Sequence, residues 1–173
     1  YNNKDNSEAL KYFRSSKFLI KQHNSYLEKY IYSLVLEGKV QQAINQIKQN
    51  LTINNSNFFE AHLILALDSL KKKNYKKSKD FLEQSYKFIN NDRYSLIIYE
   101  TLKQYLYVFE ENKIQKTKKI YGNFSYINEV FQRCYLDDKS TQIYFERFFS
   151  NANNNDYSRY IFFYINYLIE NGK

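Results

Sequence analysis

The chain has 173 residues, with no proline, methionine or tryptophan, three glycines and one cysteine, and its formal net charge is +8. A single cysteine excludes an internal disulfide and a cysteine-rich metal site. No apolar run approaches the roughly 18 residues that a membrane-spanning helix needs. The positive charge would suit a nucleic acid, an acidic partner or an anionic membrane surface, and it is equally consistent with a solvated lysine-rich face.

The first half of the chain predicts a single helix followed by two helical hairpins. Residues 7–20 read as an amphipathic helix with a cap at Asn6 or Ser7. The next helix begins after residues 23–25 and ends at Gly38, because glycine readily adopts the left-handed conformation that terminates helices. Residues 40–51 form its partner. Residues 58–72 and 75–86 form the second hairpin, which turns at Lys73 and Asn74.

The second half keeps the helical pattern, but fewer residues mark the ends of its helices. A helix is expected over residues 93–109, followed by a basic stretch over residues 110–121 and a break at residues 122–123. Another helix covers residues 124–136. A short aromatic helix follows over residues 141–149, a polar loop over residues 150–156 and a last helix over residues 157–170.

Similar residues recur at a spacing of about 35. Ala9, Ala43 and Ser78 are small residues that lie 34 and 35 positions apart, where a bulky side chain would keep two helices from closing. Gly38 and Lys73 lie 35 apart at the inner turns. The pattern that begins at Tyr26-Leu27 also returns at Tyr160-Ile161, displaced by 134 positions, which is close to four periods. A fixed period of this length predicts stacked helical hairpins.

These residues resemble the tetratricopeptide repeat, a helical hairpin of about 34 residues with small residues where its helices pack most closely. The likeness is strongest over residues 5–88. The signature is degenerate, since His62 replaces the usual tryptophan, Ser78 and Ser85 replace alanines, and Asn55 and Asn90 lie near the place of the closing proline. The chain as a whole resembles the large tetratricopeptide-type proteins of alphaproteobacteria, in their AT-rich marine representatives.

The resemblance implies an all-α fold, an α-solenoid of antiparallel helix-turn-helix repeats over the whole chain. The expected units are a half repeat, two full repeats, two divergent repeats and a terminal helix, at residues 5–22, 24–54, 58–90, 92–121, 123–151 and 156–173. Residues 7–20 would be the second helix of a repeat whose first helix precedes them. The chain is therefore expected to be part of a longer solenoid.

In such a stack the first helix of each hairpin lines a concave groove. The resemblance therefore implies a partner-binding groove that would hold an apolar segment of another protein. An alternative is that these side chains pack against neighbouring repeats, above all Leu63 and Leu67. The candidate groove residues are Glu28, Tyr32, Val35, Leu63, Leu67, Leu70, Phe162 and Asn166.

No catalytic, cofactor or metal motif occurs in the sequence. His23 and His62 lie 39 positions apart without cysteine companions, and there is no nucleophile elbow or phosphate-binding glycine loop. Cys134, flanked by apolar residues, is expected to be an inert thiol. The expected function is a non-enzymatic scaffold that binds a protein segment, with no cofactor. A basic-surface nucleic-acid binder using residues 71–79 and a purely architectural spacer are alternatives, the first disfavoured because that patch has no arginine.

Overall fold

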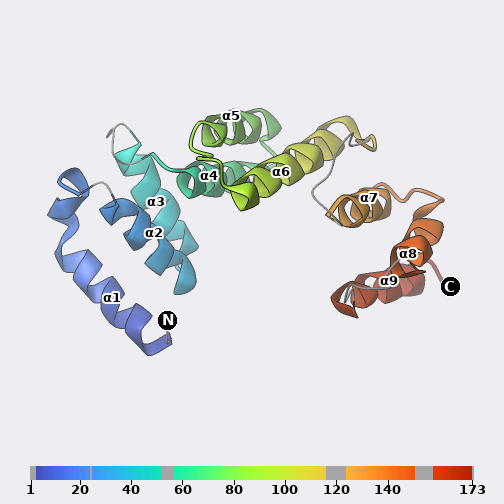
Figure 1. Cartoon of the computed structure of the whole chain (residues 1–173), viewed down its shortest axis with the longest axis horizontal. Helices are drawn as coiled ribbons and strands as arrows, with labels where there is room; N and C mark the ends of the chain where they lie inside the picture. Colours follow the sequence, from blue (N-terminus) through green and yellow to red (C-terminus); the bar gives the residue numbers. More distant parts are fainter. Residues whose placement is uncertain (1–2, 24, 52–56, 116–123, 151–157, 173) are drawn as a thin grey trace. The chain divides into compact units, whose positions relative to one another are not determined.

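A computed structural model of the chain describes residues 3–23, 25–51, 57–115, 124–150 and 158–172, and all regular secondary structure in these residues is helical (Figure 1). The all-α prediction is confirmed for this part of the chain. The chain divides into two units, Tyr1–Tyr99 and Glu100–Lys173. The helices of the first unit are α1 (Asn3–Ser15), the 3-10 helix η1 (Lys17–Lys21), α2 (Tyr26–Leu36), α3 (Val40–Asn50), α4 (Phe59–Lys71) and α5 (Tyr75–Tyr86). Helix α6 (Arg93–Glu111) runs from the first unit into the second, which also contains α7 (Phe124–Tyr135), α8 (Thr141–Ser150) and α9 (Ser158–Glu170).

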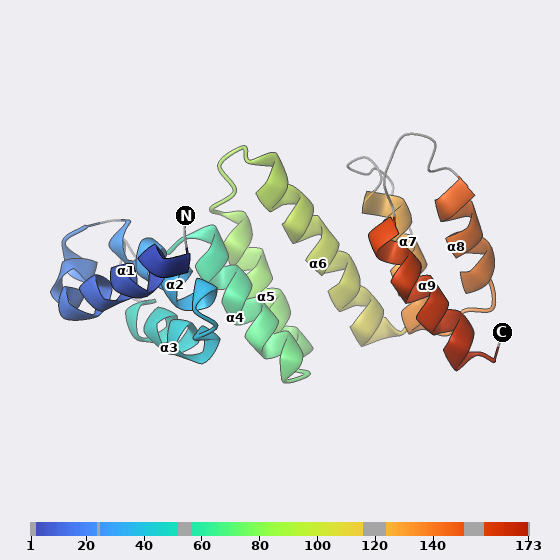
Figure 2. The same ribbon diagram turned by 90° about the horizontal axis from the view of Figure 1, so that it is seen from below.

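The first unit has one continuous apolar core that joins α1, η1, α2, α3 and α4. Helix α2 lies beside both α1 and α3, and α4 lies beside α5 in an antiparallel hairpin (Figure 2). Helices shorter than about 15 residues are marginal alone in water, so each of these depends on its neighbours for stability. The buried members of the core are Leu10, Ile20, Tyr26, Leu27, Tyr30, Ile31, Leu34, Ala43, Ile44, Ile47, Ala61 and Leu65.

The hairpins α2–α3 and α4–α5 turn in the same way. At the end of α2, the N–H of Lys39 donates to the Leu34 carbonyl (2.8 Å) and the N–H of Gly38 donates to the Val35 carbonyl (2.9 Å), with Gly38 at a φ of +69°. At the end of α4, Asn74 and Lys73 donate to Ser69 and Leu70 at 2.9 and 2.8 Å, and Lys73 has a φ of +56°. Both ends are Schellman motifs, which satisfy the last carbonyls of a helix.

Burial in these two hairpins repeats at an offset of 35 residues. Seven pairs of positions at this offset are buried in both hairpins, although only a minority hold similar side chains. The pairs are Tyr26 and Ala61, Leu27 and His62, Tyr30 and Leu65, Ile31 and Ala66, Leu34 and Ser69, Ala43 and Ser78, and Ile47 and Leu82. The 35-residue spacing of the sequence therefore corresponds to a spacing of buried positions.

The beginning of the chain differs from its prediction. Helix α1 ends at Ser15 and is followed by the 3-10 helix η1, so residues 7–20 are not one continuous helix. The hydroxyl of Ser15 donates to the Tyr12 carbonyl at 2.9 Å, and two consecutive serines favour such local bonding over a continuing helix. Asn6 lies inside α1 and is not its cap.

Polar contacts join α6 to α7 in the second unit. The side chain of Asn128 on α7 accepts a hydrogen bond from the Tyr105 hydroxyl (3.2 Å) and donates to Thr101 (3.3 Å) and Gln104 (3.5 Å). Burial raises the pKa of Tyr105 to about 12. Buried amides are therefore part of this contact.

Helices α7 and α8 form a third hairpin with the same kind of turn. Asp137, at a φ of +50°, donates to the Cys134 carbonyl (3.2 Å), and Asp138 donates to the Arg133 carbonyl (3.0 Å). The guanidinium of Arg133 binds Glu129 at 2.7 Å and lies over the Tyr144 ring at 3.7 Å. The assignment of residues 123–151 to a divergent repeat stays a prediction.

Helix α8 packs on α9 through a core of aromatic and aliphatic side chains. The buried residues of this core are Val130, Phe145, Phe148 and Tyr167. The ring of Phe145 stacks on that of Tyr164 at 4.8 Å between centroids. Ring pairs therefore supply much of the contact at this end of the unit.

Several predictions fall outside the described residues. They are the helix start at residue 24, the second half of the basic stretch at residues 116–121, the break at residues 122–123 and most of the loop at residues 150–156. Helix α6 ends at Glu111 and residues 112–115 are not helical. The second helix of a repeat over residues 92–121 is thus not found among the described residues, and the division of that range stays a prediction.

Candidate functional site

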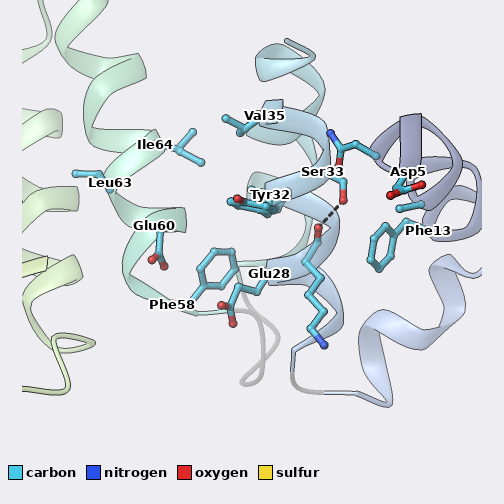
Figure 3. A pocket seen from close by; sticks show the side chains of 14 residues that line it. Asp5, Phe13, Glu28, Tyr32, Ser33, Val35, Phe58, Glu60, Leu63 and Ile64 are labelled. Carbon is cyan, nitrogen blue, oxygen red and sulfur yellow. Dashed lines mark hydrogen bonds between the residues drawn. The ribbon is translucent and has the colours of Figure 1, made fainter. Parts of the chain in front are cut away.

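A cavity of about 730 Å³ lies over α2, between α1 and α4 (Figure 3). We call it the α2 groove. Its size falls within the range of about 300 to 1,000 Å³ that is typical of ligand-binding pockets. Fourteen residues line it: Asp5, Asn6, Ala9, Phe13, Glu28, Lys29, Ile31, Tyr32, Ser33, Val35, Phe58, Glu60, Leu63 and Ile64.

Helix α2 provides the floor of the groove. Glu28, Tyr32 and Val35 follow each other at helical spacing and face the groove, while Leu27 and Leu34 face the core. Tyr32 is 58% exposed and Val35 is 38% exposed. These side chains are therefore available to a partner, and their replacement need not disturb the core.

Helix α1 forms one wall and is fixed to α2 by aromatic contacts. The ring of Phe13 meets that of Tyr26 edge-on at 5.3 Å, and the Tyr26 hydroxyl donates to the Phe13 carbonyl at 2.6 Å. Burial, with the nearby Tyr30, raises the pKa of Tyr26 and keeps this hydroxyl a donor. At the opposite end, the Asn6 amide reaches Glu37 at 3.5 Å, so α1 runs antiparallel to α2.

Helix α4 forms the other wall, and His62 fixes its rotation. The ring of His62 is buried, stacks on Phe88 with 5.3 Å between centroids and lies 3.2 Å from the Asn57 side-chain oxygen through Nε2. Burial, and then the charge of Lys87, hold the pKa of His62 below its ordinary value. With His62 turned into the core, its neighbours Leu63 and Ile64 face the groove. His62 thus fills a packing position, as expected from the sequence.

Four of the eight candidate groove residues line the α2 groove: Glu28, Tyr32, Val35 and Leu63. Leu67 and Leu70 do not, although they lie 35 positions after Tyr32 and Val35. Leu67 is 44% exposed and Leu70 is half-buried, one to two turns beyond the wall. The part of α4 that faces α2 is instead Glu60, Leu63 and Ile64, which are spaced three and four apart.

Phe162 and Asn166 belong to α9 in the second unit and are not among the residues that line this groove. Phe162 is 65% exposed and Asn166 is half-buried. Beside them, Ile161 and Ile165 are exposed, whereas Leu27 and Ile31, 134 positions earlier, are buried. The repeated sequence of α2 and α9 therefore lies in different surroundings.

Sequence reasoning missed the contributions of α1 and of the start of α4. Phe13 was assigned to a convex outer helix, so it was not considered for the groove. Phe58 and Glu60 lie one turn before the residues that the repeat register selected. The i, i+3, i+4 spacing of Glu60, Leu63 and Ile64 on one helical face is the signal that could have found the contribution of α4.

The described residues contain no group of three or more His, Cys, Asp or Glu side chains that could hold a metal ion. Cys134 is half-buried, and burial, together with Glu170 and Asp137, raises the pKa of its thiol. A raised pKa lowers the thiolate fraction and makes the sulfur a poorer nucleophile at neutral pH.

The basic residues 71–79 are exposed at the end of α4 and on α5. Lys72 pairs with Asp68 at 2.8 Å, and Lys48 reaches the same carboxylate at 3.2 Å. The hydrogen bond from Lys72 lowers the pKa of Asp68. The ammonium of Lys77 lies 5.8 Å from the Phe81 ring centre. None of these residues lines the α2 groove.

A scan against models of known protein families, and searches of curated proteins and solved structures, found no significant match to the chain. In the part of the chain that the structure describes, no helix has both the length and the apolar character needed to cross a membrane.

Proposed function

We propose that the chain is a non-enzymatic scaffold built from degenerate tetratricopeptide-like hairpins, and that it binds a segment of a partner protein in the α2 groove. Under this proposal the hairpins α2–α3 and α4–α5 are two consecutive repeats of an α-solenoid. Glu28, Tyr32, Val35 and Leu63 are the partner-binding residues that the repeat register and the groove have in common.

The observation that carries the proposal is that four of the eight residues selected from the sequence line one largely apolar cavity. The lining includes aromatic and aliphatic side chains from three helices, among them Phe13, Tyr32 and Ile64. An apolar groove between helices suits a segment that inserts several apolar side chains. Tyrosine contributes large contact area at a small cost in conformational entropy, which is why it is common where proteins bind each other.

The spacing of the buried positions gives independent support. A stack of hairpins places the first helix of each repeat on the same side, so that α2 and α4 both border the groove. The matching Schellman turns at Gly38 and Lys73 and the 35-residue offset of the buried positions agree with such a stack.

Selection from a displayed library of random 12-residue peptides tests the proposal. The full chain is immobilised, and enriched peptides are retested on the double variant Tyr32→Ala, Leu63→Asp. We expect most enriched peptides to lose at least about tenfold in affinity, because central apolar contacts each contribute on the order of 1 to 2 kcal/mol to an interface.

A matched control separates the groove from surface hydrophobicity in general. The variant Tyr12→Ala, Leu67→Asp makes the same two changes at exposed positions outside the groove. It should bind like the unchanged chain, and circular dichroism should show equal helicity in all three proteins. The single variant Tyr32→Ser, at an exposed residue, replaces the double variant if Leu63→Asp loses helicity.

Peptides that bind all variants equally, or no enrichment over an unrelated helical protein, would contradict the proposal. The second result would favour a purely architectural role for the chain.

A further inference from the structure

The α2 groove combines an apolar interior with acidic ends. Its interior contains Phe13, Ile31, Tyr32, Val35, Phe58, Leu63 and Ile64. Its charged lining residues are three carboxylates, from Asp5, Glu28 and Glu60, and one lysine, Lys29. This lining has a formal charge of −2, whereas the chain as a whole has +8. The net charge of the groove lining is therefore opposite in sign to that of the whole chain.

The carboxylates lie at two separate places along the groove. Glu28 and Glu60 are in the first turns of α2 and α4, on either side of Phe58 (Figure 3). Asp5 is in the first turn of the antiparallel helix α1, near the far end of α2. Between them, Tyr32 and Val35 continue the apolar floor.

Within the part of the chain that the structure describes, these carboxylates have no ion-pair partner. All three side chains are exposed, and none forms an ion pair with another of the described residues. The five ion pairs found among those residues use Glu37, Asp68, Glu129 and Asp138 as their acidic partners. A carboxylate in the first turn also stabilises its own helix through the helix dipole. This effect accounts for an acidic residue at that position but not for its orientation toward the groove.

We propose that the α2 groove selects a short apolar segment with Lys or Arg on both sides of the apolar residues. Glu28 and Glu60 would bind the cation at one end and Asp5 the cation at the other. From Glu28 to Val35 the helix rises about 10 Å, which an extended chain covers in three or four residues. This inference rests on the proposed function, because it names the chemistry of the segment that the groove binds.

The charge of the whole molecule makes the inference testable. A net charge of +8 repels cationic peptides at long range, so non-specific attraction would favour acidic ones. A preference for cationic peptides must then come from a local acidic site.

The test compares peptides selected on two variants of the full chain. The variant Asp5→Asn, Glu28→Gln, Glu60→Gln removes the groove carboxylates, and the variant Glu8→Gln, Asp80→Asn, Glu83→Gln removes three exposed carboxylates of the first unit outside the groove. Both variants have the same net charge, +8 + 3 = +11. All six replacements are near-isosteric and exposed, so both variants should remain folded.

Among random 12-residue peptides whose binding depends on Tyr32, we expect the fraction of Lys and Arg to exceed that of the unselected library at least about twofold. The excess should persist on the control variant and disappear on the groove variant. A single selected peptide should lose about tenfold in affinity on the groove variant, since exposed charge pairs each contribute a factor of about two. Raising the salt concentration should reduce the difference.

The outcomes separate this inference from the proposed function. Peptides that depend on Tyr32 but show no cationic excess, or an excess that survives on the groove variant, would overturn the charge preference and leave groove binding intact. The absence of any peptide that depends on Tyr32 would overturn both.

Discussion

The hairpins α2–α3 and α4–α5 occupy equivalent positions with different side chains. Leu27, Leu34 and Ala43 in the first correspond to His62, Ser69 and Ser78 in the second, and all six are buried. The two serines of the second hairpin donate their hydroxyls to backbone carbonyls of the same hairpin. Ser69 donates to the Leu65 carbonyl at 2.8 Å and Ser78 donates across the hairpin to Ala66 at 2.8 Å. Burial therefore defines these positions more strictly than polarity does.

The largest difference between the hairpins is expected at Leu34 and Ser69. Leu34→Ala removes a fully buried side chain and should lower the free energy of unfolding by about 2 to 5 kcal/mol. Ser69→Ala should change it by about 1 kcal/mol or less, because the hydroxyl bonds only a carbonyl of its own helix. Urea unfolding followed by circular dichroism at 222 nm measures both. An equal loss of unfolding free energy in the two variants would show that the two positions are not equivalent in packing.

Ala43 and Ser78 test how closely the helices of each hairpin approach. Ala43 is completely buried, so Ala43→Leu should destabilise the chain by about 1 to 3 kcal/mol through overpacking. Ala43→Ser copies the second hairpin, where the Ser78 hydroxyl donates to the Ala66 carbonyl. Ile31 lies 35 positions before Ala66, so its carbonyl is the equivalent acceptor for the new hydroxyl. We expect that variant to stay within about 0.5 kcal/mol of the unchanged chain. A loss of more than about 2 kcal/mol for Ala43→Ser would contradict the equivalence, because a buried hydroxyl without a partner costs about that much.

The equivalence of these positions was largely visible in the sequence. The small residues Ala43 and Ser78 and the turn residues Gly38 and Lys73 gave the period, and the helices of the first unit follow the apolar spacing. The end of α1 was missed because the serine pair that ends it lies inside an amphipathic pattern. Asn128 was missed because a buried amide has no periodic signal and is recognised only from its partners on another helix.

The candidate site was predictable only on the helix that provides its floor. Glu28, Tyr32 and Val35 lie opposite the buried stripe of α2, so helical spacing was sufficient to select them. Leu67 and Leu70 were selected by translation through 35 residues, which assumes that each repeat contributes the same face to one continuous surface. The groove instead lies over a single helix, and its walls depend on how α1 and α4 pack against α2, which local spacing does not specify.

The two turns differ in the residue that adopts the left-handed conformation. Gly38 has a φ of +69° and open space around the position of a Cβ, so Gly38→Ala should cost about 1 kcal/mol from backbone conformation alone. Lys73 already has a side chain at a φ of +56°, so Lys73→Gly should stabilise the second hairpin by up to about 1 kcal/mol. Hydrogen exchange of amides in each hairpin reports the two effects separately. Changes of the same sign in the two variants would contradict a shared turn geometry.

The smallest expected difference is a sensitivity to acid that only the second hairpin has. Burial lowers the pKa of His62 below the ordinary value of 6.5, so the unfolded chain takes up a proton at a higher pH than the folded chain does. Folding stability from this residue is therefore complete above pH 6.5 and decreases as the pH falls toward the lower pKa of the folded state. The variant His62→Leu gives the second hairpin the residue type that Leu27 provides in the first. The midpoint of urea unfolding should fall more between pH 7.5 and pH 5 for the unchanged chain than for this variant. If the midpoint fell equally in the two proteins, His62 would be hydrated in the folded chain. The rotation of α4 would then have to be fixed by Phe88 and Asn57 alone.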